Sequence, residues 1–137
     1  MKILAVDLGE TRTGIAISDF NEKLASPVCV IEERNRERLL TKIANIVEEN
    51  HVSEIVVGLP KNMDGSEGES AKKAREFQGL LKDKTKLTVV MIDERGTTIT
   101  AHNYLNFTDT RGKKRKRIID SVAATIILQN YLDSKKQ

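Results

Sequence analysis

The apolar positions along the chain fall into short continuous blocks and into longer blocks with helical spacing. Three short blocks, Lys2–Asp7, 13–18 and 24–31, are rich in aliphatic and β-branched residues, which is typical of strands. Because the connections between them are short, we expect an antiparallel meander. Residues 55–59 and 87–92 are two further apolar runs, and they predict two more buried strands.

Helical spacing occurs between and after these strands. Residues 36–50 predict a helix, because apolar side chains recur there every three or four positions. Ser66 and Glu69 have the spacing of a capping box, which predicts a helix that begins at Ser66. Two further helices are expected over residues 98–105 and 116–132. In the helix that is expected to begin at Ser66, the buried stripe should consist of Ser70, Ala74, Phe77 and Leu81.

The order of these elements predicts the fold class. Strands that are separated by helices should pair in parallel through right-handed crossovers, whereas the first three strands pair antiparallel. The prediction is an α/β fold, with a five-stranded mixed sheet and helices on both faces. A length of 137 residues suits one domain, and we expect residues 1–137 to form it without an internal linker.

Composition restricts the class of protein further. Cys29 is the only cysteine, which excludes an internal disulfide and a cysteine-rich zinc site, and we expect it to be a small apolar strand residue. No apolar run approaches the length of a membrane span and no signal peptide is recognisable, so we expect a soluble cytoplasmic protein. The formal net charge is only +3, but six of the seven residues in 111–117 are basic. Such a cluster favours a polyanionic partner, and its alternative interpretation is a solvated loop.

Carboxylates occupy positions where strands should end. Asp7 closes the first strand, and Asp93 and Glu94 follow the last one. The carboxyl ends of parallel strands meet at one edge, where α/β proteins bind ligands. Asp120 lies within the apolar stripe of the last helix, where burying a charge costs several kcal/mol unless it is paired or bound to metal. Each aspartate also has a structural alternative, as a turn or helix cap or as an arginine partner.

Three carboxylates without histidine or thiol partners would select a hard cation, Mg²⁺ or Mn²⁺. Next to a basic segment, the chemistry that fits is metal-assisted hydrolysis of a phosphodiester, with two ions sharing the carboxylates. Crowded like charges are expected to raise the pKa of at least one of these carboxyl groups. His51 and His102 are isolated in the sequence, and we interpret them as packing or surface residues.

Four ordered blocks, at 7–18 (DLGETRTGIAIS), 57–66 (VGLPKNMDGS), 93–98 (DERGTT) and 120–129 (DSVAATIILQ), resemble the YqgF/RuvX family. Its members are described as Holliday junction resolvases and as nucleases that mature the 5′ end of small-subunit ribosomal RNA. The resemblance implies a ribonuclease H-like fold with strand order 3-2-1-4-5. It also implies a catalytic and metal-binding set of Asp7, Glu94 and Asp120. Gly96 departs from the family pattern, which usually has leucine there.

The resemblance and the residue pattern together define the expected site. Neighbouring strand residues point to opposite faces, so only one of Asp93 and Glu94 can face Asp7 directly. We choose Glu94 for its longer side chain and its match to the family, with Asp93 as the alternative. The expected partner is structured RNA or branched DNA, with no membrane, bound by a monomer or weak homodimer. The residues expected to contact nucleic acid are Arg12, Lys61, Asn62, Arg95, Arg111, Lys113, Lys114, Arg115, Lys116 and Arg117.

Two other classes of function compete with a nuclease. A nucleic-acid-binding protein that retains the fold without the activity would carry the same basic segment. The pattern Asp7-x-Gly-x-Thr-x-x-Gly14 also resembles the phosphate loop of the actin, sugar kinase and Hsp70 ATPases. Those proteins close two duplicated lobes around ATP, whereas 137 residues provide one, so length argues against that class.

Overall fold

The computed structural model of the chain describes residues 1–94 and 112–135, and within the last helix it describes the side chains from residue 122 onward. Five strands form one sheet in the order β3-β2-β1-β4-β5, which confirms the predicted mixed sheet. β1 pairs antiparallel with β2, and β2 with β3, whereas β1–β4 and β4–β5 are parallel. The strands are β1 (Lys2–Asp7), β2 (Arg12–Ser18), β3 (Ala25–Glu32), β4 (Val52–Leu59) and β5 (Thr88–Asp93).

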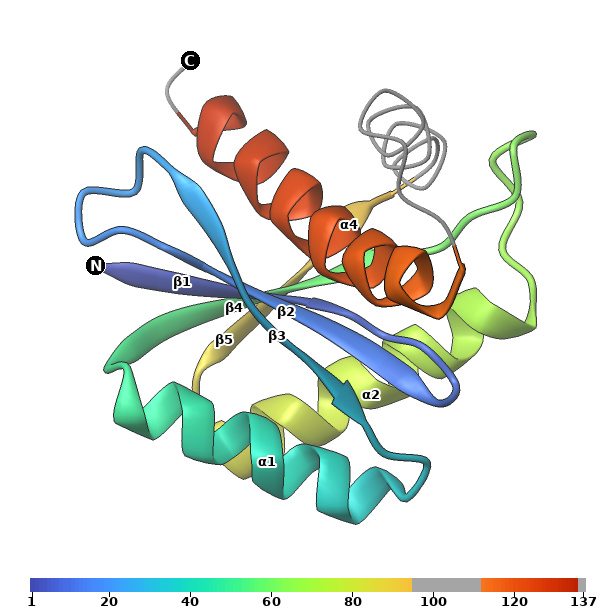
Figure 1. Cartoon of the computed structure of the whole chain (residues 1–137), viewed down its shortest axis with the longest axis horizontal. Coiled ribbons are helices and arrows are strands. Elements are labelled where there is room, and N and C mark those ends of the chain that lie inside the picture. The colour runs from blue at the N-terminus through green and yellow to red at the C-terminus, as the bar shows by residue number, and fades with distance from the viewer. Residues whose placement is uncertain (95–111, 136–137) are drawn as a thin grey trace.

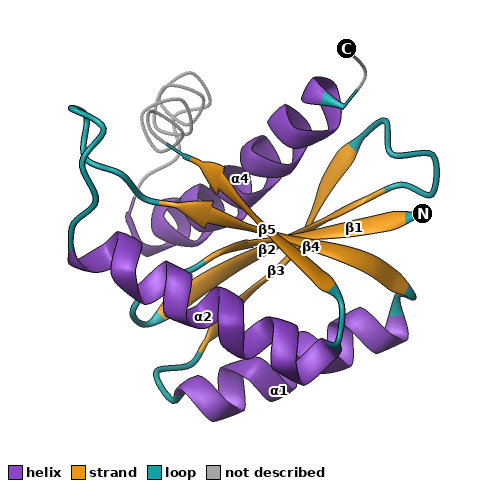
Figure 2. Ribbon diagram, turned by 180° about the vertical axis from the view of Figure 1, so that it is seen from behind, coloured by secondary structure: helices purple, strands orange, loops and turns teal. Residues whose placement is uncertain are grey.

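Helices cover both faces of the sheet. α1 (Arg36–Glu49) and α2 (Glu69–Thr85) lie on one face, and α4 (Gly112–Ser134) crosses the other, as Figures 1 and 2 show from opposite sides. The alternation of β1 produces two cores, because successive side chains point to opposite faces. Leu4 and Val6 are buried under α1 and α2, whereas Ile3 and Ala5 are buried under α4.

Polar contacts fix α4 on the sheet at its C-terminal half. The side-chain amide of Gln129 accepts from the backbone N–H of Ala25 at 3.0 Å and donates to the carbonyl of Lys23 at 3.0 Å. The hydroxyl of Tyr131 donates to the Glu54 carboxylate near the start of β4. These contacts and the apolar packing of Ile127 hold the helix across the strands, so its first turns lie at the edge where β1 ends (Figure 1).

The predicted capping box at Ser66 is wrong. α2 begins at Glu69, and its N-cap Gly68 makes no side-chain hydrogen bond to the helix. The reason is that the Asp64 carboxylate accepts hydrogen bonds from both the hydroxyl of Ser66, at 2.6 Å, and its backbone N–H, at 2.9 Å. Ser66 is thereby held in the preceding loop. Ser70 is consequently exposed, and Ala71 takes its place in the buried stripe.

Two other boundaries differ from prediction. α4 begins at Gly112, so residues 112–117 are helical, whereas a loop was expected up to residue 116. Lysine and arginine are good helix formers, so the basic composition does not oppose a helix there. β4 starts at Val52 because Val52 pairs with Lys2 of β1. The helix expected at 98–105 lies outside the described residues.

Within the described residues, no helix is long and apolar enough to cross a membrane. Cys29 is half-buried in β3 and packs against the apolar core, as a small apolar strand residue would.

Candidate active site

The parallel strands β1, β4 and β5 end together at one edge of the sheet. Their register brings Leu59 opposite Asp93, while Val6 of β1 pairs with Val57 of β4. The ladder continues one residue past β5, because the backbone N–H of Glu94 donates to the carbonyl of Leu59 at 3.2 Å. Asp7 and Glu94 are therefore held by backbone hydrogen bonds at the ends of β1 and β5, the two strands that flank β4.

Alternation along the strands decides which carboxylates share a face. On β1, Asp7 follows Ala5 by two residues and therefore points to the same face, where Ala5 is buried under α4. On β5, Val90 and Ile92 pack into the same core, and Glu94, two residues after Ile92, points to the same face. Met91 packs on the opposite side, against the core under α1 and α2, so Asp93 belongs to that face. The structure therefore brings Glu94, and not Asp93, to the side of Asp7.

A hydrogen bond joins the carboxyl groups of Glu94 and Asp7. Burial raises the pKa of Glu94 above its ordinary value; the hydrogen bond from Asp7 opposes this rise, and the charge of Asp93 adds to it. A raised pKa was expected at this cluster from like-charge crowding. The larger cause is desolvation of Glu94 beneath α4.

The turn after Asp7 is tight and built around Gly9. A Cβ atom at Gly9 would collide with the carbonyl oxygen of Arg12, so only glycine allows the chain to reverse this closely. The fully buried Thr13 accepts the backbone N–H of Gly9 through Oγ1 at 3.4 Å. The turn thus holds the end of β1, and with it Asp7, in a defined position.

Asp120 belongs to α4, but its side chain lies outside the described part of the structure. Ala123 and Ala124, one helical turn later, are buried against the sheet. Asp120 precedes these two alanines by three and four positions in the helix. Among the described side chains, no group of three acidic, histidine or cysteine residues is arranged to hold a metal ion.

The residues expected to bind nucleic acid lie in several places. Arg12 opens β2 opposite Glu32, next to the turn that follows Asp7. Lys61 and Asn62 belong to the loop after β4, where the Asn62 amide donates to Oγ of Ser66 at 2.9 Å and so supports the loop itself. Lys113, Lys114, Arg115, Lys116 and Arg117 lie in the first turns of α4. Arg95 and Arg111 are outside the described residues.

Comparison with known proteins places this arrangement in a family. Residues 1–134 match the family RuvX, described as Holliday junction resolvase. The chain belongs to the RuvX family. This confirms the resemblance that the four sequence blocks indicated.

Relatives of the chain match over nearly their whole length. A protein of Caldanaerobacter subterraneus subsp. tengcongensis named "Putative pre-16S rRNA nuclease" is 41% identical over 137 residues, covering 99% of both chains. One of Clostridium tetani with the same name is 42% identical over 134 residues, covering 98% of this chain and 97% of that protein. The fold is similar to RuvC of Thermus thermophilus in complex with a Holliday junction substrate. That match has a TM-score of 0.62 and 11% identity, over 99% of this chain and 96% of the other.

Gly58 is the residue of this candidate site that the sequence interpretation missed. It lies on β4 with the parity of Val56, so it faces α4 between Asp7 and Glu94. A Cβ atom there would overlap Oε2 of Glu94 and approach Cδ1 of Ile127 to 2.8 Å. Gly58 interrupts an otherwise apolar strand run, which is a sequence signal for close approach by another group.

Proposed function

We propose that this chain is a nuclease that hydrolyses phosphodiester bonds of structured nucleic acid at the edge carrying Asp7 and Glu94. The observation that carries the proposal is the hydrogen-bonded pair of these two carboxyl groups, placed at the ends of the strands on either side of β4 and partly removed from water. The relatives named as pre-16S rRNA nucleases support it, because they align with this chain from end to end.

The donor set fits a divalent metal of the Mg²⁺ or Mn²⁺ class. Two oxygen-donor side chains converge, and one of them, Glu94, is held in a site that disfavours its charge unless a cation is present. Asp120, in α4 and one helical turn before the buried Ala123 and Ala124, is the residue we propose as the third ligand. Two ions bound to such carboxylates would supply an activated water and charge neutralisation at the leaving oxygen.

The residues of the chain position this chemistry. Gly58 leaves room for the Glu94 carboxylate beneath α4, and the Gly9 turn holds Asp7 at the end of β1. Arg12 adjoins that turn, and the basic first turns of α4 lie at the same edge (Figure 1). We propose that these cations and Lys61 hold the phosphate backbone across the carboxylates. Phosphate contacts of this kind orient a nucleic acid without reading its sequence.

For the substrate, we propose the 5′ region of pre-16S ribosomal RNA in the cytoplasm, following the name of the relatives. The family description makes a four-way DNA junction the second candidate. Cleavage of either substrate requires the same hydrolysis of a phosphodiester bond, and the two substrates differ in the shape of the nucleic acid. Membership of the family over residues 1–134 favours this function over an ATPase-like phosphate loop at residues 7–14.

The experiment that tests the proposal compares cleavage of both substrates with Mg²⁺, with Mn²⁺ and with EDTA. Wild-type protein should cut at least one substrate only when a metal is present, and Glu94→Gln should not cut. Glu49→Gln, which removes an exposed carboxylate from the end of α1, is the matched control and should cut normally. Tight binding of both substrates without metal-dependent cutting would instead support the non-catalytic alternative.

A further inference from the structure

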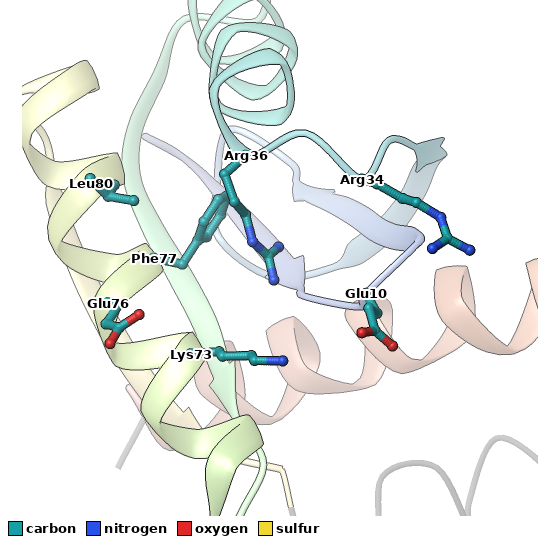
Figure 3. A pocket seen from close by; sticks show the side chains of 7 residues that line it. All are labelled: Glu10, Arg34, Arg36, Lys73, Glu76, Phe77 and Leu80. Carbon is teal, nitrogen blue, oxygen red and sulfur yellow. The ribbon is translucent and has the colours of Figure 1, made fainter.

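A cleft of about 410 Å³ lies on the opposite face from α4, between the start of α1 and the middle of α2. Figure 3 shows the guanidinium of Arg36 and the ammonium of Lys73 extending into it from the two helices. The β1–β2 turn contributes Glu10, and Leu80, which is 45% exposed, forms an apolar wall. A smaller hollow beside it is lined by Arg36 and Lys73 together with Leu8 and Gly9. The cleft therefore reaches the residues that directly follow Asp7.

Arg36 and Lys73 lack acceptors for their charge among the residues that the structure describes. Nη1 of Arg36 is buried and has no hydrogen-bond partner among residues 1–94 and 112–135, although the guanidinium carbon lies 5.6 Å from the ring centroid of Phe77. Within the described part of the chain, Lys73 makes no hydrogen bond or ion pair, even with Glu10 or Glu76 across and beside it. A buried donor left without an acceptor is destabilising, so this arrangement is explained if a ligand supplies the acceptor.

The helix that carries Arg36 adds a second argument for an anion. Arg36 is the first residue of α1, a helix of 14 residues whose N-cap is Asn35. The N-terminus of a helix is the positive end of its dipole, where a cation is unfavourable and a phosphate is favourable. Arg34, just before the cap, also lines the cleft and increases the positive charge there.

From these observations we infer that the cleft between α1 and α2 binds a backbone phosphate of the nucleic acid, at a position that flanks the site of cleavage. Arg36 and Lys73 would hold the phosphate oxygens, and Leu80 would cover the adjoining sugar or base. The volume suits one nucleotide unit, and the continuity with the turn after Asp7 connects the two sites along one edge of the molecule. This inference rests on the proposed function for its ligand, but it assigns a contact that neither the family nor the residue pattern indicated.

The test measures binding without catalysis, in EDTA, by fluorescence anisotropy of a labelled hairpin RNA with a single-stranded extension and of a four-way DNA junction. Lys73→Gln is the principal variant because Lys73 is exposed, so the fold should tolerate the change. Lys82→Gln is the matched control: it removes one exposed cation from α2 toward the opposite edge. Arg36→Gln provides a second variant, and its melting temperature shows whether loss of the Phe77 contact disturbs the fold.

Lys73→Gln should weaken binding of at least one substrate by roughly three- to tenfold and reduce the slope of log K against log salt by about 0.7–0.9, the effect of one lost phosphate contact. Single uncharged methylphosphonate linkages, placed one at a time along that substrate, identify the phosphate. One linkage should weaken wild-type binding as much as Lys73→Gln does and should cause no further loss in that variant. Lys82→Gln should bind like wild type.

Several outcomes would overturn the inference. Lys73→Gln and Arg36→Gln could bind as wild type does, or the linkage scan could show equal losses in wild type and variant at every position. A third outcome is that binding of adenosine monophosphate depends on Arg36 and Lys73, whereas binding of the two nucleic-acid substrates does not. The cleft would then be a site for a small phosphorylated ligand. Because all these measurements are made without metal, a protein that binds in the expected way but never cuts would refute the proposed function and leave the cleft assignment intact.

Discussion

The carboxylate of Glu94 occupies the space that a side chain at Gly58 would need. Gly58 lies on β4, Glu94 directly follows the adjacent parallel strand β5, and both face α4. The absence of a side chain at position 58 is therefore what allows Glu94 to turn back over the edge of the sheet and reach Asp7. This relationship makes Gly58 a positioning residue for the proposed metal site, although it carries no functional group.

Gly58→Ala should consequently displace Glu94. Its methyl group would also press on Ile127, so we expect a loss of about 1–3 kcal/mol in the free energy of unfolding from overpacking. Displacing a ligand by about 1 Å can reduce turnover by roughly a hundredfold, which is more than this loss of stability explains in a protein that remains folded. Turnover and thermal melting of the same preparation would measure the two effects.

Gly79→Ala is the control for that substitution. Gly79 lies exposed on α2, and a Cβ atom there meets nothing within 4 Å. Alanine should therefore stabilise the helix by up to about 1 kcal/mol and leave cleavage unchanged. If Gly58→Ala cut as fast as Gly79→Ala, Gly58 would have no positioning role.

The pKa of Glu94 predicts how the stability of the metal-free protein depends on pH. Burial raises this pKa above the ordinary value of 4.5, so the folded state favours the protonated form more than the unfolded state does. The resulting stabilisation is complete below about pH 4.5 and is lost as the pH rises through the pKa of Glu94 in the folded protein.

Denaturant melts in EDTA across this range would show the decline, and Glu94→Gln should flatten it because glutamine cannot titrate. Glu49→Gln should retain the wild-type profile. A metal ion competes with the proton for the same oxygens, so the stabilisation by Mg²⁺ or Mn²⁺ should increase over the same pH range. A Glu94→Gln profile identical to that of wild type would mean that Glu94 is not the titrating group.

The sequence was sufficient to predict the sheet and the meeting of Asp7 and Glu94 at its edge. The apolar runs predicted five strands and the lengths of the connections predicted their directions, whereas the order 3-2-1-4-5 came from the family resemblance. The choice between Asp93 and Glu94 was made on side-chain length and on the family. The alternation along β5 leads to the same choice, because Val90, Ile92 and Glu94 all point to the face that α4 covers.

Other features depended on contacts that the sequence does not reveal. The Ser66–Glu69 spacing fits a capping box, yet Asp64 competes successfully for Ser66, so the helix begins at Glu69. The cleft at Arg36 and Lys73 joins residues that are far apart in the chain, and no local pattern marks it. Gly58 could have been noticed as a glycine in a buried strand, but its neighbour Glu94 becomes evident only in the fold.

The basic first turns of α4 predict a salt-dependent effect on binding. Replacing Lys113, Lys114 and Lys116 by glutamine in one variant should weaken binding across unrelated sequences. The slope of log K against log salt should become shallower by about 0.9 for each duplex phosphate contact that is lost. The triple substitution of Lys82, Lys84 and Lys86 removes the same charge around the end of α2, away from Asp7, and should change little. Equal effects of the two triple variants would show that only net charge matters.

The most direct test of the central claim is Asp7→Asn. Asparagine preserves the volume at the end of β1 but removes the charge that a divalent cation requires, so metal-dependent cleavage should disappear. Removing one of two adjoining carboxyl groups also relieves repulsion when both are ionised, so the melting temperature at neutral pH should stay level or rise, and binding in EDTA should persist. If Asp7→Asn melts several degrees lower and still cuts its substrate, Asp7 is structural and the carboxylate mechanism is wrong.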